Sequence, residues 1–326
     1  MHNQTRLTCA SSNFFKHIMD LVLELLDPIV MDSVYTSAKS SLQSAACQHI
    51  DEQEDMILAS ARNRTLAYNR LCTLASDSGI WQRNDSRRQS ISIFLFTLIS
   101  SFSLYLILGT ICYHLNFDPR WKSDPKFHKH QVREEMTESL TTLFWLNVLT
   151  VPIFLGQVHG YAKIYPLGEA SLAYEMLQYP LFVLFSDAGM YWLHRMFHVP
   201  VLFRWMHKHH HYYVIPTPFA AHAFHPIEAY IMSLPIYASS YLLPMSNVAQ
   251  LVVFFWTFAW TFLMHDNRDK FHTVHHKNVN YNFGQFFSFF DWLFGTYWDH
   301  SDFFAGRTEK ETTNRSVVRI EGKNRS

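Results

Sequence analysis

The chain has 326 residues, of which 48% are hydrophobic and 16% aromatic, and its formal net charge is zero with histidine neutral. This length suits one large domain or two small ones, and the balanced charge gives no basic or acidic surface of the kind that binds nucleic acid. The four cysteines show no CxxC spacing, which argues against a disulfide framework or a thiolate metal site; they are Cys9, Cys47, Cys72 and Cys112.

Residues 1–90 are predicted to form an amphipathic and mobile N-terminal segment. Apolar residues recur at helical spacing over 14–35, interrupted by Pro28, so this stretch either lies on a membrane surface or packs on the rest of the chain. Residues 36–90 are polar and rich in Ser and Arg. The first residues lack the basic-then-apolar pattern of a cleaved signal peptide, so we expect the first membrane span to direct targeting.

Residues 91–300 are predicted to form an all-α integral membrane domain with four to five transmembrane helices, followed by a polar tail at 301–326. The segment Ile91–Phe117 contains no Asp, Glu, Lys or Arg. At 1.5 Å per residue it is long enough to cross a hydrocarbon core about 30 Å thick. Four further spans are expected, the last two separated by a turn near Pro244–Asn247; they are 139–158, 174–193, 227–243 and 248–264.

The orientation of the spans follows from the order of the histidines and the basic residues. The last two spans form a hairpin, so the His-rich segments before and after it face the same side of the membrane. The connecting segment 118–136 is rich in Lys and Arg, which favours the cytosol. Asp187 lies inside the third span and indicates that this helix is partly buried in protein. We therefore expect a multi-pass protein with histidine clusters that face the cytosol.

Twelve of the 20 histidines fall between His194 and His276. They include three clusters, HxxxH within HRMFH, HxxHH within HKHHH and HxxHH within HTVHH, and residues three and four apart share one face of a helix. Neutral imidazole suits iron, zinc, copper or nickel, and eight ligands are too many for one ion and suit two. A zinc-storage tract would be polar and low in complexity, whereas these clusters adjoin membrane spans. The eight histidines of the three boxes are His194, His198, His207, His210, His211, His272, His275 and His276.

Other side chains are candidates because of their positions. His225, within HAFHP, and His265, which ends the fifth span, are predicted to be additional metal ligands. His209 fills the variable position of its box and is predicted not to bind metal. Ligating imidazoles usually donate their second N–H to a neighbouring acceptor. The candidates for the surroundings of the ligands are Asp187, His222, Glu228, Asp266 and Asp291.

At these clusters the sequence resembles the sterol desaturase and fatty acid hydroxylase superfamily, which carries the boxes HxxxH, HxxHH and HxxHH between membrane spans. The stretches HKHHHYYVIPTPFAAHAFHPIEAY and NYNFGQFFSFFDWLFGTY, and more faintly MDLVLELLDPIV, are similar to the fungal sterol C-5 desaturases (lathosterol oxidases). The resemblance covers about 90–300 and 18–35. It implies that the eight box histidines match the family's boxes, and that His225 and His265 match further histidines of this branch.

The resemblance also implies a fold and an activity. The fold would be a helical membrane anchor in the endoplasmic reticulum with a cytosolic cap that holds two iron ions. The activity would be the O2-dependent introduction of the C5–C6 double bond into a delta7-sterol of ergosterol-type biosynthesis. Electrons would come from NAD(P)H through cytochrome b5 reductase and cytochrome b5. The expected partners are the sterol, O2, cytochrome b5 and membrane lipid, and Phe219, Phe224 and Trp260 either line the sterol slot or simply pack.

Two alternatives stay open at this stage. One is another oxidase of the superfamily, such as a C-4 methylsterol oxidase or a hydroxylase of another lipid or a terpenoid. The other is a catalytically inactive membrane paralogue that keeps a metal site. Only Asn267–Phe271 lies between Asp266 and His272, where relatives usually have a much longer segment. This shortening favours the inactive alternative.

Overall fold

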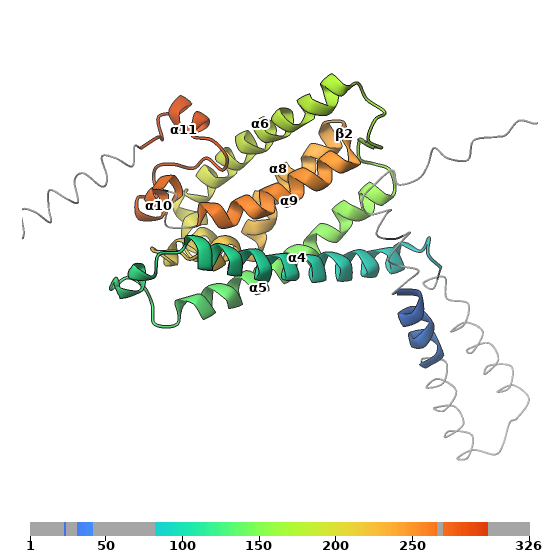
Figure 1. The fold of residues 1–326 in the computed structure, drawn as a ribbon, viewed down its shortest axis with the longest axis horizontal. Coiled ribbons are helices and arrows are strands. Elements are labelled where there is room, and N and C mark those ends of the chain that lie inside the picture. The colour runs from blue at the N-terminus through green and yellow to red at the C-terminus, as the bar shows by residue number, and fades with distance from the viewer. Residues whose placement is uncertain (1–22, 24–30, 42–81, 266–269, 299–326) are drawn as a thin grey trace, which may run out of the picture.

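The computed structural model describes residues 23, 31–41, 82–265 and 270–298 (Figure 1). Most of the N-terminal segment expected at 1–90, and all of the tail expected at 301–326, lie outside these residues. Within the described part of the N-terminal segment, residues 32–41 are helical. This helix is fastened to the domain because Asp32 accepts hydrogen bonds from Arg83 and Arg88.

Five long helices build the domain, and each corresponds to one of the predicted spans. They are α4 (Ser86–Asn116), α5 (Gln131–Val158), α6 (Leu172–Phe197), α8 (Pro226–Leu242) and α9 (Asn247–Met264). Three of them begin after a side chain that accepts a hydrogen bond from the first turn, as expected of helix N-caps. These caps are Asp85 before α4, Ser171 before α6 and Ser246 before α9.

Among the described residues, α4, α5 and α9 are long and apolar enough to cross a membrane. The helix α8 has 17 residues, and α6 carries Glu175, Asp187 and Arg195. The mainly helical fold is therefore confirmed, and the number of four to five spans stays a prediction. Asp187 is buried within the protein, which agrees with the expectation that α6 is partly enclosed by other helices.

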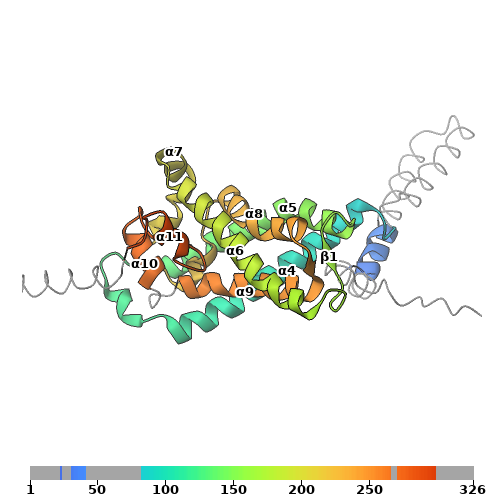
Figure 2. The same ribbon diagram turned by 90° about the horizontal axis from the view of Figure 1, so that it is seen from above.

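The long helices run back and forth along one axis, so the last turns of α4, α6 and α9 and the first turns of α5 and α8 lie at the same end (Figure 1). Two further helices, α10 (Lys270–Lys277) and α11 (Phe289–Leu293), lie at this end in both views (Figures 1 and 2). At the other end, β1 (Ile164–Tyr165) pairs in parallel with β2 (Met245–Ser246). This pairing joins the loop before α6 to the turn before α9, and the histidine boxes lie at the opposite end.

Short helical turns fold the connections at the histidine end. Between α4 and α5 lies η3 (Pro119–Ser123). The connection from α6 to α8 contains four turns, of which η4 is π-helical, and π-helical turns frequently occur at functional sites. The four are α7 (Pro200–Leu202), η4 (Phe203–His207), η5 (His210–Tyr212) and η6 (Pro218–His222). Because η6 contacts α4, α5 and α9, it closes the end of the bundle.

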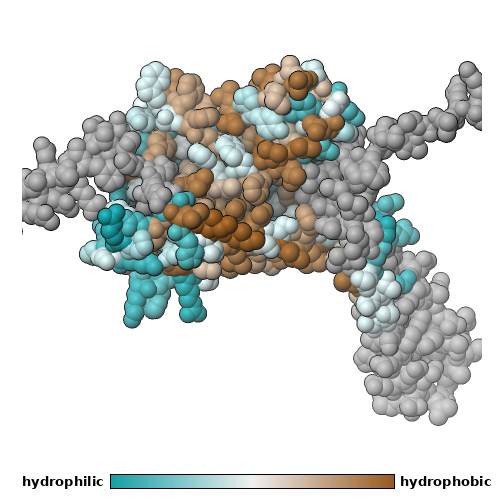
Figure 3. Space-filling model, in the orientation of Figure 1, coloured by the Kyte–Doolittle hydropathy of each residue, from teal (hydrophilic) through white to brown (hydrophobic). Residues whose placement is uncertain are grey.

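The interior of the bundle is aromatic and closely packed. One buried cluster joins α4, α5, η6 and α9 through Tyr105, Leu143, Phe219 and Phe262. Gly189 lets α6 approach α8, since a Cβ there would lie 2.7 Å from the ring of Pro235, and small residues serve this purpose between membrane helices. On the visible surface, apolar residues cover much of the long helices, while hydrophilic residues gather at the end where η3 lies (Figure 3).

Candidate metal centre

Nine histidines converge at one end of the bundle in two groups, and each group could hold a metal ion. In each group, one ligand atom from every residue lies within 4.8 Å of the others. The five-histidine group consists of His194, His198, His207, His211 and His275. The four-histidine group consists of His210, His265, His272 and His276.

The backbone divides the two HxxHH boxes between these groups. In each box, the residues at i and i+4 enter one group and the residue at i+3 enters the other. His207 and His211 thus join the five-histidine group while His210 joins the four-histidine group. In α10 the assignment is reversed, because His272 and His276 enter the four-histidine group and His275 the other. Each His-His pair therefore straddles the two groups, so the two candidate ion positions adjoin.

The imidazole nitrogens approach one another as ligands of a shared ion do. Nε2 of His211 lies 3.0 Å from Nε2 of His207, and Nε2 of His265 lies 3.3 Å from Nε2 of His210. A zinc–nitrogen bond is about 2.0–2.1 Å long, so two nitrogens bound at right angles lie about 3 Å apart. The rings of the two groups are also close, with centroids of His211 and His276 4.8 Å apart.

In five of the candidate ligands, Nδ1 makes a hydrogen bond to a neighbouring oxygen, which fixes the orientation of the ring. For four of them, the Nδ1–H donates to a backbone carbonyl. His194 donates to Phe283, His210 to Ala223, His265 to Thr261 and His275 to Tyr281, with N–O distances of 2.9, 3.3, 2.7 and 2.6 Å. The fifth, His207, is hydrogen-bonded through Nδ1 to the fully buried carboxylate of Glu228. Each of these rings therefore directs Nε2 toward its group.

Two of the expected carboxylates act on the backbone beside the histidines. Asp291 accepts the N–H groups of Phe283 and Gly284 at 2.8 and 2.7 Å, and Asp187 accepts those of Gln285 and Phe286 at 3.1 and 2.8 Å. The loop 283–286 is thus held from both sides, and its Phe283 carbonyl accepts from His194. Both carboxylates therefore act on the five-histidine group indirectly, by fixing the loop whose carbonyl accepts from His194.

Burial and unsatisfied nitrogens show that this donor set fits metal ions. Several ring nitrogens have no hydrogen-bond partner among the described residues, although buried polar atoms are normally paired. They include Nε2 of His194, His198 and His275, and both ring nitrogens of His272 and His276. Burial, together with repulsion from nearby imidazoles, lowers the pKa of His211 to about 3 and that of His210 well below its usual value. The rings are therefore neutral near pH 7, which is the form that binds iron, zinc, copper or nickel.

Among the described residues, the two remaining histidine candidates lie outside the two groups. His225 is the N-cap of α8 and is only partly buried. His222 lies among aromatic rings, with its centroid 4.6 Å from that of Phe258 and 5.5 Å from that of Phe262. His209 is exposed. Asp266 lies outside the described residues.

A polar stripe on α5 was missed by the sequence analysis. Gln131, Glu135, Ser139 and Thr142 are buried and lie four, four and three residues apart on one face of the helix. Glu135 accepts hydrogen bonds from Gln131 and from both the N–H and the hydroxyl of Thr217. Regular polar spacing within an apolar helix is a signal in the sequence, which the assignment of 118–136 to a basic connection overlooks.

Residues of this stripe donate hydrogen bonds to backbone carbonyls next to the four-histidine group. Ser139 and Tyr105 both donate to the carbonyl of Phe219, at 2.7 and 2.8 Å. Thr142 donates to the carbonyl of Phe224, whose ring stacks on His210 with centroids 4.0 Å apart. Of the expected slot-lining aromatics, Phe224 therefore contacts a ligand candidate, Phe219 packs in the core, and Trp260 donates to the carbonyl of Gln285.

Comparison with known proteins gives matches over most of the chain. A Delta(7)-sterol 5(6)-desaturase of Aspergillus fumigatus is 35% identical over 293 residues, covering 86% of this chain and 85% of that protein. One of Leptosphaeria maculans is 33% identical over 311 residues, covering 86% of each chain. The sequence model described as fatty acid hydroxylase matches residues 179–296.

The chain belongs to the fatty acid hydroxylase family of the sterol desaturase superfamily. The family match at 179–296 contains all nine histidines of the two groups. The superfamily inferred from the three histidine boxes is therefore confirmed. No solved structure gives a significant match.

Proposed function

We propose that this chain is an O2-dependent sterol C-5 desaturase with a diiron centre. The observation that carries the proposal is the pair of adjoining, buried, all-histidine groups at the end of an apolar helical bundle. The relatives named as Delta(7)-sterol 5(6)-desaturases support the choice of substrate. Of the ten ligands expected from the sequence, we propose the nine that lie in the two groups; His225 lies in neither group.

In the proposed reaction, a delta7-sterol loses one hydrogen from C5 and one from C6, and a double bond forms between them. The sterol gives up two electrons and two protons. Cytochrome b5 delivers two more electrons from NAD(P)H, and with two further protons O2 is reduced to two molecules of water. Two iron ions bound by the histidines would supply the activation of O2, which amino-acid side chains alone cannot supply.

The residues of the chain have distinct parts in this proposal. The five-histidine group would hold one ion and the four-histidine group the other. Glu228 accepts the Nδ1–H of His207, which orients the ring and makes Nε2 a stronger ligand. The burial of His207, His210 and His275 keeps water away from the centre, which protects a reactive oxidant from side reactions.

The proposed location is the endoplasmic reticulum membrane, with the histidine groups on the cytosolic side. The basic connection 118–130 lies at the same end of the bundle as α10 (Figure 1), and basic connections favour the cytosol. A cytosolic centre is also accessible to the proposed electron donor, cytochrome b5. The short segment before His272 does not keep α10 from the site, since all three of its box histidines lie in the groups. The short segment is therefore compatible with a complete metal centre.

Sterol profiling tests the proposal. We expect expression of the chain in a cell that lacks sterol C-5 desaturation to restore C5-unsaturated sterols, and the His275→Ala variant, made at the same level, to restore none. A hydroxylated or C-4-oxidised lipid in place of a C5-unsaturated sterol would indicate another oxidase of the superfamily. Bound metal without any O2-dependent product would indicate the inactive paralogue. Either result would overturn the proposed activity.

A further inference from the structure

The segment after α10 exposes an unusual number of large apolar side chains. We call this the α11 surface; it consists of Phe287, Phe289, Trp292, Leu293, Phe294 and Tyr297, each at least 40% exposed. Between Lys277 and residue 298, Asp291 is the only charged residue, and it is fully buried. Soluble proteins rarely expose a contiguous apolar patch of this kind unless a partner covers it.

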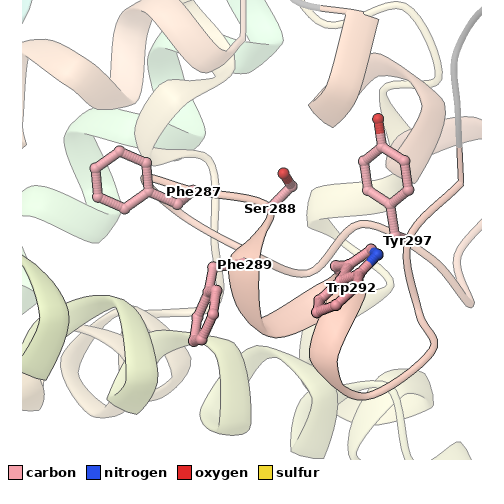
Figure 4. A pocket seen from close by; sticks show the side chains of 5 residues that line it. All are labelled: Phe287, Ser288, Phe289, Trp292 and Tyr297. Atoms are coloured by element: carbon pink, nitrogen blue, oxygen red, sulfur yellow. The ribbon is translucent and has the colours of Figure 1, made fainter.

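The α11 surface surrounds a shallow hollow. Phe287, Phe289, Trp292 and Tyr297, together with Ser288, line an open cavity of about 390 Å³. Figure 4 shows the four aromatic side chains spread around it, with the serine hydroxyl between them. No charged side chain lines the cavity. Its lining therefore suits an apolar occupant rather than an ionic or strongly polar one.

The α11 surface continues onto a flank of α6. The ring of Phe294 lies 4.8 Å from that of Trp192, and Trp192 is itself half exposed. Leu184 and Leu177 follow about two and four turns back on the same side of α6, and both are exposed. In Figure 3 pale and brown residues lie together at the upper left, where Figure 1 shows α11 and the end of α6, whereas the strongly hydrophilic residues gather below, around η3.

We propose that the α11 surface inserts into the phospholipid interface of the membrane that the long helices cross. The apolar flank of α6 leads directly onto it, and α6 packs against α9, one of the helices able to span. Tryptophan and tyrosine, here Trp292 and Tyr297, concentrate at the level of the lipid headgroups because their rings are apolar with one polar end. The absence of exposed charge from the surface leaves a charged protein partner no ion to pair with.

This insertion would bear on the metal centre through one residue. Asp291 lies within α11, and its carboxylate holds the N–H groups of Phe283 and Gly284. The Phe283 carbonyl in turn accepts from His194 of the five-histidine group. Seating α11 in lipid therefore holds the loop that orients a ligand, so the membrane contributes to the order of the site.

The test measures the depth of a single label in the full-length, metal-loaded protein in phosphatidylcholine vesicles. The four natural cysteines are first replaced, and Cys112 is changed to Ala because it is buried in the core cluster. A single cysteine is then introduced, as Trp292→Cys or as the matched control His209→Cys, and is labelled with a fluorophore. His209 is exposed and directly precedes His210 of the four-histidine group. Retention of metal shows that each variant is folded, and Phe289→Cys replaces Trp292→Cys if that variant loses its metal.

We expect phospholipids with a quencher on the acyl chain to quench the label at 292 several-fold more strongly than the label at 209. Iodide in the aqueous phase should show the opposite order. Equal iodide quenching at the two positions would overturn the proposal, because the α11 surface would then face water. Protection of position 292 from both quenchers would also overturn it, since a protein, such as a second copy of this chain, would then cover the surface.

Discussion

Thr142 is the position at which the support of the four-histidine group by α5 can be tested most cleanly. Its hydroxyl donates to the carbonyl of Phe224, and the ring of Phe224 stacks on His210 with an interplanar angle of 13°. Thr142→Val keeps the shape of the side chain and removes the donor. Loss of a hydrogen bond whose acceptor stays buried costs about 1–3 kcal/mol, which corresponds to about 2–12 °C in the midpoint of thermal unfolding for a domain of this size.

The neighbouring residue supplies the control. Thr141 is exposed, and its hydroxyl donates within α5, to the carbonyl of Thr137 at 2.7 Å. We expect Thr141→Val to change the free energy of unfolding by no more than about 0.5 kcal/mol.

The assay follows thermal inactivation in lipid nanodiscs and the loss of metal to a chelator over time. Thr142→Val should lower the inactivation midpoint and release metal faster, because Phe224 no longer holds the His210 ring in place. Equal midpoints and equal metal loss for the two valine variants would refute the assigned role of the α5 stripe.

Further predictions concern the ions, the ligands and the topology. The purified chain should hold about two metal ions, with nitrogen and no sulfur neighbours in X-ray absorption, since the groups contain only histidine; one ion in active protein would contradict this. His210→Ala should lose metal and abolish turnover, whereas the exposed His209→Ala should keep most of both, and equal losses would contradict the assignment. His225→Ala should retain both ions, because it lies in neither group; loss of an ion would make it a ligand. Tags inserted at Lys126 and Gly168 should lie on opposite sides of the membrane by protease protection, and a shared side would refute the topology.

Much of the helical framework could be predicted because its signals are local. The charge-free run after residue 90 predicted α4, and Asp85, Ser171 and Ser246 are the kind of residue that caps a helix where it begins. The spacing within the boxes also indicated that their histidines would share faces. The position of Glu228 in the sequence makes it a candidate acceptor for a ligating histidine, and in the structure it is hydrogen-bonded to Nδ1 of His207.

The division of the histidines could not be predicted from spacing. Neighbouring residues on a helix point about 100° apart, so His210 and His211 had to diverge, but the sequence does not say which ring each would meet. Likewise His225 and His265 looked equivalent as candidates. Only the fold shows that His265, at the end of α9, lies 3.3 Å from His210, while His225, at the start of α8, lies in neither group.

The sequence by itself determined which residue types could bind metal and which segments are apolar enough to enter a membrane. These properties depend on neighbours within a turn or two of the chain. The tertiary structure decided which imidazoles share an ion position, which carbonyls accept their second N–H, and that four polar residues of α5 support the loop of Thr217, Phe219 and Phe224. Such contacts join residues up to 89 positions apart, and their geometry is fixed only when the helices pack.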